Sequence, residues 1–393
     1  MIKIDNKPDN VLIEKYYKSV VSWFNMTHES FSSNAEALTF RGFINSNLKR
    51  IITADFNSLL GIADELYERF PIILESFSSF TFFYNYREIA ESIITKLISC
   101  NLTTKAGKTA FSEISALAVK KINAVSVNTK SYFLPALISD LKNKTTPAAR
   151  KEHLLSICDF ICGRFMPLII PDWIMQIPLC FDYKKMDSEI LKDLVETLNL
   201  KVCPMCNETN IEIINNSKTN TRYRPALDHF LPKSRHPVFS LSIYNLIPVC
   251  HTCNSTFKRD QETYLPKHCN PYVGGVDNDI FFCATYFIFD SLYGANSSVK
   301  RRIELMASNE ALKHNISLFA LESIYNRSLP REEVQHILDL CKEYKALSSM
   351  MSFEYFKRNF LKFDEAADLS CITYGKLRYD TIKIIEADYL DKM

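Results

Sequence analysis

Apolar residues recur at helical spacing through the first half of the chain. Between Val11 and Phe24 the apolar positions fall three or four residues apart, with Lys and Glu between them. This spacing places the apolar side chains on one face of an amphipathic helix. The same pattern predicts further helices, over residues 35–52, 56–70, 86–98, 110–119, 132–141, 148–165 and 188–198. The first half of the chain is therefore predicted to be helical, with the apolar stripes forming a core.

The pattern changes after these helices. Residues 208–222 are polar and rich in Asn, which indicates a hairpin or a loop. Short apolar runs then predict two strands and a following helix, over 225–231, 245–249 and 254–264. Asp228 and His229 are neighbours on the first strand, so an extended strand directs them to opposite faces. Only a twist or a bulge lets both side chains serve one site.

Helical spacing returns near the C-terminus, over residues 298–309, 332–345 and 353–360. Residues 280–289 are apolar and aromatic, and the pattern fits one or two strands as well as a buried helix. A chain of 393 residues exceeds the usual size of a single domain. We therefore expect a mainly α protein with a helical domain of unknown role, a small central module and a mostly helical C-terminal region, over 1–198, 199–275 and 276–393.

Composition and charge fit a folded, helix-rich protein and do not identify a partner. The net charge is +2, 47% of the residues are hydrophobic and only 8 are Gly. A nearly neutral protein can still carry a local basic surface. Residues 218–260 contain only two acidic residues, Asp228 and Asp260, against a larger basic set: Lys218, Arg222, Arg224, Lys233, Arg235, Lys258 and Arg259.

Cysteine usage and the N-terminal sequence indicate a reducing cytoplasm. Four of the 12 Cys residues form two Cys-x-x-Cys pairs, and the others lack the spacing of a disulfide framework. The first residues lack the apolar segment of a signal peptide. The most apolar run, 165–180, is shorter than a bilayer span and contains Pro167, Pro171 and Pro178. We therefore expect no membrane partner.

The two Cys-x-x-Cys pairs predict a structural zinc site. They are Cys203 with Cys206 and Cys250 with Cys253. Each pair places two thiolates on one side of a tetrahedral ion, so two pairs close the site. A zinc held in this way contributes on the order of 10 kcal/mol to folding. The gap between the pairs is longer than in a compact zinc ribbon, and it contains Asp228-His229.

This arrangement resembles the HNH endonuclease family, in the variant braced by a four-Cys zinc. An Asp-His pair lies on a first strand, an Asn begins the second strand, and another Asn directly follows the last Cys and opens a helix. The resemblance covers roughly residues 202–271 and implies the ββα-metal fold. It implies a role for each matching residue: Asp228 as a ligand of a catalytic divalent metal, His229 as general base, Asn245 as the residue that fixes the His loop, and Asn254 as second metal ligand.

The chemistry of these residue types agrees with that implication. Phosphodiester hydrolysis needs an activated water, which a His near its ordinary pKa supplies, and charge neutralisation at the leaving oxygen, which a hard cation supplies. Two protein ligands leave open positions for phosphate and water, which suits Mg²⁺ or Mn²⁺. Lys258, one turn after Asn254, either touches the scissile phosphate or is a solvated Lys. Three other histidines are expected to be structural or solvent-exposed: His236, His251 and His268.

The resemblance implies an endonuclease that hydrolyses DNA to 5′-phosphate and 3′-hydroxyl ends. Zinc-braced HNH modules in longer helical chains often serve restriction or anti-phage defence, sometimes beside an ATPase, and the helical flanks then provide sensor, partner or homo-oligomer surfaces. The chain itself contains no Gly-rich phosphate loop. Two alternatives stay open. One is a toxin nuclease that cleaves RNA, and the other is a zinc-dependent nucleic-acid or protein binding module without catalysis.

Overall fold

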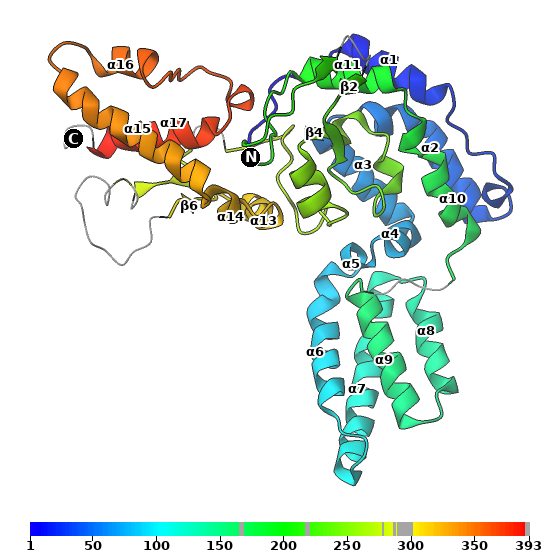
Figure 1. Ribbon diagram of the computed structural model, residues 1–393. Helices are drawn as coiled ribbons and strands as arrows, with labels where there is room; N and C mark the ends of the chain where they lie inside the picture. The colour runs from blue at the N-terminus through cyan, green and yellow to red at the C-terminus, as the bar shows by residue number, and fades with distance from the viewer. Residues whose placement is uncertain (165–168, 217–220, 277–278, 286–287, 289–301, 390–393) are drawn as a thin grey trace. The chain divides into compact units, whose positions relative to one another are not determined.

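The computed structural model describes residues 1–164, 169–216, 221–276, 279–285, 288 and 302–389 (Figure 1). It is mainly helical, as the sequence predicts. The chain divides into two compact units. The cysteine unit comprises Met1–Lys18, Met186–Phe230 and Tyr244–Met393, and the helical unit comprises Ser19–Lys185 and Leu231–Ile243.

The helical unit is built from amphipathic helices that the apolar spacing predicts, together with α4 (Pro71–Phe77), α5 (Ser79–Phe82) and α10 (Asp172–Cys180), which it does not predict. The predicted helices are α2 (Ala35–Thr53), α3 (Phe56–Arg69), α6 (Arg87–Ser99), α7 (Lys105–Thr129), α8 (Leu134–Asp140) and α9 (Pro147–Ile161), and α1 (Asn10–Val21) ends in this unit. Capping side chains set several helix starts; Asn34 Oδ1 accepts the Glu36 N–H at 2.7 Å, and Thr146 caps α9. In Figure 1, α6, α7, α8 and α9 lie side by side as a bundle.

Aromatic packing forms one part of the core of the helical unit. The Phe40 ring lies 5.4 Å from that of Phe70 and 5.4 Å from that of Trp173. All three side chains are buried. Helix α9 ends at Ile161 rather than at the predicted 165, because Gly163 takes a left-handed conformation at φ +73° that turns the chain. A Cβ at this position would also collide with Phe80, so the turn requires Gly.

Residues 231–243 follow the strand of Asp228 and His229 in the chain but belong to the helical unit. Three buried side chains anchor this segment there. His236 Nδ1 lies 2.7 Å from Tyr67 Oη, Ser242 Oγ donates to the Ile51 carbonyl at 2.5 Å, and Ser240 Oγ donates to the Phe181 carbonyl. The spacing of apolar residues predicts no helix or strand between 231 and 245. The structure shows a segment fixed by buried hydrogen bonds.

The cysteine unit combines helices with three two-stranded antiparallel sheets. Its strands are β1 (Ile214–Asn216), β2 (Thr221–Tyr223), β3 (Ala226–His229), β4 (Leu246–Val249), β5 (Phe282–Cys283) and β6 (Glu304–Leu305). Its helices are α11 (Ser188–Leu198), a π-helix (Thr252–Lys258), α13 (Glu310–Leu318), α14 (Leu321–Tyr325), α15 (Ser328–Leu347), α16 (Phe353–Asn359) and α17 (Gly375–Ile384). The hairpin expected within 208–222 is formed by β1 and β2.

Two predicted helices are wrong in part. Over 302–309 the chain forms β6 instead of a helix, and residues 298–301 lie outside the described part. Asn326 explains this, because its side chain accepts the Ile303 N–H and donates to the Ile303 carbonyl, both at 2.9 Å, as a neighbouring strand would. The helix predicted over 254–264 ends at Lys258, since Arg259 has φ +50° and leaves the helical region.

No helix among the described residues combines the length and the apolar character that a bilayer span requires. The apolar run 165–180 contains α10, which starts after Pro171 and includes Pro178. Residues 165–168 of this run lie outside the described part of the chain. The sequence predicts one or two strands or a helix over residues 280–289, and β5 occupies two of them. Residues 286–287 and 289 also lie outside the described part of the chain.

Candidate metal centre and nuclease site

The four predicted zinc ligands come together in one buried cluster. The sulfur atoms of Cys203, Cys206, Cys250 and Cys253 all lie within 4.8 Å of one another, and each residue is at most 2% exposed. Around a zinc with Zn–S bonds of about 2.3 Å, tetrahedral geometry places the sulfurs about 3.8 Å apart. Cys206 Sγ and Cys250 Sγ are 4.0 Å apart, which fits this spacing and is far longer than a disulfide. This group could hold a zinc ion.

The backbone conformation of each cysteine pair positions its two thiol groups. In the first, Asn207 directly follows Cys206 and takes a left-handed conformation at φ +51°, which lets its N–H donate to the Cys203 carbonyl at 2.8 Å. In the second, the Cys253 N–H lies 3.4 Å from Cys250 Sγ and donates to it. Such N–H···S contacts favour the thiolate. Each pair therefore presents two sulfurs from one tight turn.

The electrostatics of the cluster call for a cation. Hydrogen bonding from the neighbouring thiols, first that of Cys203, holds the pKa of Cys250 well below its usual range. Burial raises the pKa of Cys203 well above it. Four buried thiolates cannot coexist without compensating positive charge, because an unpaired buried charge is strongly unfavourable. A bound dication would supply that charge.

The C-terminal region is fastened to the first cysteine pair through Asn207. The Asn207 Nδ2 group donates to the carbonyls of Leu369 at 2.9 Å and Ile372 at 3.2 Å, and its Oδ1 accepts the Lys376 N–H at 3.0 Å. Tyr325 Oη, which is fully buried, donates to the Cys206 carbonyl at 2.5 Å. The sequence analysis missed these residues. The only sequence signal for Asn207 is its position directly after a Cys-x-x-Cys pair, where a left-handed residue completes the turn.

Strands β3 and β4 position the Asp-His pair in a regular ladder. Asp228 is opposite Ile247 and His229 is opposite Leu246, without a bulge. Of the two devices that would let both side chains serve one site, a bulge is absent from this four-residue pairing, and a twist of the ribbon is left. Both side chains are nevertheless buried, at 4% exposure for Asp228 and 8% for His229, so both faces of this ribbon are covered. Asn245, which precedes β4, is fully buried, and its carbonyl accepts the Phe230 N–H at 2.9 Å.

Lys258 is buried against Asp228 and is not a solvated surface residue. It is 1% exposed, and its Nζ lies 3.1 Å from Asp228 Oδ1 and 2.6 Å from the His229 carbonyl oxygen. The ammonium thus joins the carboxylate to the backbone of the adjacent His. Burial raises the pKa of Asp228, and the Lys258 charge opposes that rise.

The second carboxylate oxygen of Asp228 is the unusual atom of this site. Asp228 Oδ2 is buried and has no hydrogen-bond partner among the residues that the structure describes. A buried carboxylate oxygen without a partner is costly unless a donor or a cation satisfies it. A hard divalent cation prefers such an oxygen. The Asp228 carboxylate is therefore suited to the role of metal ligand that the resemblance implies.

The π-helix carries Asn254 and Lys258. Its i to i+5 hydrogen bonding includes the Arg259 N–H, which donates to the Asn254 carbonyl at 2.8 Å. The Asn254 side chain is half-buried. A π-helix is rare and often lies at a functional site. Lys258 Nζ contacts the Asp228 carboxylate and the main-chain oxygen of His229, and Asn254 lies on the same helix as Lys258.

The other histidines in this stretch have different surroundings. His236 is fully buried and bonded to Tyr67, and His251 is exposed. His268 Nδ1 lies 2.8 Å from the Pro266 carbonyl oxygen, and burial lowers its pKa. Among the described residues, the four-cysteine cluster is the one group of three or more Cys, His, Asp and Glu side chains placed to share a metal. Of the basic residues, Lys218 lies outside the described part.

No family model matches the chain, and no solved structure matches it significantly. Protein ea31 of Escherichia phage lambda is 27% identical over an alignment of 151 residues, which covers 35% of this chain and 48% of that protein. The chain thus matches about half the length of this curated relative. A likeness of this extent shows no family, and the relative's name states no activity. The resemblance to HNH endonucleases therefore rests on the residues of this chain.

Proposed function

We propose that this protein is a metal-dependent endonuclease of the HNH type that hydrolyses phosphodiester bonds in DNA. The observation that carries the proposal is the buried Asp228 carboxylate. One of its oxygens is bound to Lys258, and the other has no partner among the described residues. Next to it in β3 is His229, and β4 leads through the second cysteine pair into the helix of Asn254.

Each residue of the site has its own role in the proposed hydrolysis. The His229 imidazole takes a proton from the attacking water, whose oxygen bonds to phosphorus. The bond between phosphorus and the 3′-oxygen breaks, and the 3′-oxygen takes a proton from solvent, leaving 5′-phosphate and 3′-hydroxyl ends. Asp228 and Asn254 would hold the catalytic ion. A divalent cation such as Mg²⁺ or Mn²⁺ supplies charge neutralisation at the leaving oxygen. Lys258 holds the Asp228 carboxylate and the His229 carbonyl in fixed positions and adds positive charge near the substrate phosphate.

The four cysteines have a structural role and take no part in the reaction. Their sulfurs are buried. Cys203 and Cys206 precede β1, Cys250 directly follows β4 and Cys253 lies at the start of the π-helix, so a zinc ion there fixes where the helix starts relative to the strand. A structural zinc with four thiolates keeps no open position for a substrate. A role in restriction or phage defence, with or without an ATPase partner, is part of the proposal on the strength of the resemblance alone.

Cleavage assays with a matched variant test the proposal. Purified protein with measured zinc content is incubated with supercoiled plasmid, linear duplex, single-stranded DNA and total RNA, in Mg²⁺ or Mn²⁺. We expect wild type to cleave DNA and His229→Ala to lose at least a factor of about 10² in rate at equal zinc, because general-base catalysis contributes about 10²–10⁴. Preferential cleavage of RNA would favour the toxin alternative. Equal cleavage by both proteins would overturn the assigned base.

A further inference from the structure

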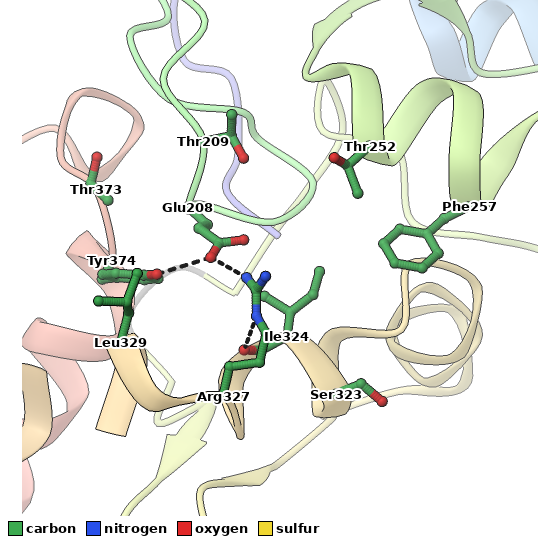
Figure 2. Close-up of a pocket in the computed structure, with 10 residues that line it drawn as sticks. All are labelled: Glu208, Thr209, Thr252, Phe257, Ser323, Ile324, Arg327, Leu329, Thr373 and Tyr374. Atoms are coloured by element: carbon green, nitrogen blue, oxygen red, sulfur yellow. Dashed lines mark hydrogen bonds and ion pairs between the residues drawn. The ribbon is translucent and has the colours of Figure 1, made fainter. Parts of the chain in front are cut away.

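A cavity lies in the cysteine unit beside the cysteine pairs. Its volume is about 560 Å³, within the range of about 300–1,000 Å³ that is typical of small-molecule sites. Figure 2 shows side chains entering it from several segments: the first cysteine pair, the π-helix, α14, the start of α15 and the residues before α17. They include Glu208, Phe257, Ile324, Arg327 and Tyr374. Nothing in the nuclease mechanism uses these residues.

The π-helix separates the cavity from the nuclease residues. In a π-helix, residues five apart are hydrogen-bonded and stack along one face. Thr252 and Phe257 are five apart, and both line the cavity. Asn254 and Lys258 are four apart and share a different face of the same helix. The irregular helix thus has two faces, one for the cavity and one for the proposed catalytic metal.

The polar side of the cavity is organised by Glu208. Its Oε1 accepts hydrogen bonds from Tyr374 Oη at 2.9 Å and from Arg327 Nη2, as the dashed lines in Figure 2 show. Arg327 Nε donates to the Ile324 carbonyl at 3.1 Å. The Arg327 side chain is 56% exposed, so its remaining N–H groups are accessible to a ligand. An arginine guanidinium held in this way is well suited to a phosphate oxygen.

The side of the cavity across from Glu208 is formed by the Phe257 ring, which Figure 2 shows entering from the π-helix. The Tyr374 side chain lies next to Glu208, on the polar side. Tyr374 is held in place: its backbone is left-handed at φ +54°, its N–H donates to the Asn207 carbonyl at 2.7 Å, and its ring contacts that of Tyr325. A non-Gly residue in this conformation is strained and often marks a ligand site. Exposed hydroxyl groups of Thr209, Thr252, Ser323 and Thr373 complete the lining.

We propose that this cavity binds a nucleotide. The aromatic and apolar surface takes the base, Arg327 binds the phosphate, and the hydroxyl groups bind the sugar and phosphate oxygens. Stacking of a base on an aromatic ring is insensitive to sequence and suits a nuclease that holds a strand. The choice of a nucleotide over other planar anions rests on the proposed function. The nucleotide is either free or part of a bound single strand, since both present the same chemistry.

Calorimetric titration of the zinc-loaded, Mg²⁺-free protein tests the proposal, because no cleavage occurs under these conditions. The probes are adenosine monophosphate, thymidine monophosphate and an oligothymidylate. Phe257→Ala is expected to weaken binding about tenfold, and Phe257→Tyr to retain it, because one stacked base contributes about that factor. Arg327→Ala is also expected to weaken binding, because it removes the guanidinium that binds the phosphate. Arg302→Ala is the matched control, since Arg302 is similarly exposed, pairs with Glu322 and does not line the cavity.

The outcomes separate this proposal from the proposed function. Binding of a mononucleotide identifies a free nucleotide as ligand, and binding of the oligonucleotide alone identifies a bound strand. His229→Ala should bind as wild type does, so loss of cleavage with intact binding concerns only the nuclease site. Absence of binding to all three probes overturns the proposal. Binding that neither Phe257→Ala nor Arg327→Ala weakens also overturns it, provided that both variants keep the zinc content and circular dichroism of wild type.

Discussion

Replacement of Lys258 by Met tests whether the charge next to Asp228 is structurally required. Met keeps the length and apolar character of the lysine stem but removes the ammonium, which contacts Asp228 Oδ1 at 3.1 Å and the His229 carbonyl at 2.6 Å. Asp228 is 4% exposed and its Oδ2 already lacks a partner among the described residues, so the variant leaves a buried carboxylate without compensation.

The expected cost is large relative to the stability of a domain. Removing one partner of a buried ion pair costs about 3–5 kcal/mol, against roughly 5–15 kcal/mol for a whole domain. At 25 °C, 1.4 kcal/mol corresponds to about a tenfold change in an equilibrium constant, so local opening of the β3–β4 ribbon should become roughly 10²- to 4 × 10³-fold more frequent. The companion change Asp228→Asn in the same chain should restore most of this loss, because no charge then remains buried.

Hydrogen exchange of peptides covering β3 and β4, followed by mass spectrometry in zinc without other divalent ions, measures this opening. Lys313→Met is the control, since Lys313 is 58% exposed and pairs with Glu310 at the surface. Millimolar Mg²⁺ should slow exchange in Lys258→Met if the ion binds the Asp228 carboxylate. Exchange in Lys258→Met as slow as in wild type would refute the reasoning, because the carboxylate would then need no cation.

Three further predictions concern the zinc cluster, its attachment and the helical unit. Wild type should contain about one zinc per chain, and Cys203→Ser should lower this content markedly in metal analysis, because three thiolates bind zinc more weakly than four. Asn207→Gly keeps the left-handed backbone but loses the hydrogen bonds to residues 369–376. The free energy of local opening of that segment, measured by hydrogen exchange, should fall by about 1–3 kcal/mol. Unchanged exchange would contradict the attachment. Burial raises the pKa of Glu75, which also binds Ser131 and the Tyr132 N–H, so the folded state holds this proton more tightly than the unfolded state. Urea unfolding of wild type relative to Glu75→Gln should therefore show stability that falls as pH rises above about 4.5, and a rising difference would contradict the sign.

The sequence by itself determined the features that depend on residues close together in the chain. Helical periodicity located most of the helices, since the apolar stripe of an amphipathic helix is visible within one segment. The spacing within each Cys-x-x-Cys pair indicated the zinc ligands, because metal geometry restricts that spacing. Asp228 and His229 stood out because they are adjacent and lie between the pairs.

Only the tertiary structure decided the features that depend on distant partners. Lys258 is buried because a carboxylate 30 residues away lies within reach of its ammonium, and no local pattern contains that information. Asn326 keeps residues 302–309 out of a helix through hydrogen bonds to Ile303. Residues 231–243 belong to the helical unit because Tyr67 and Ile51 supply their partners. In each case a buried polar group must find a partner, and the folded chain decides which one is near.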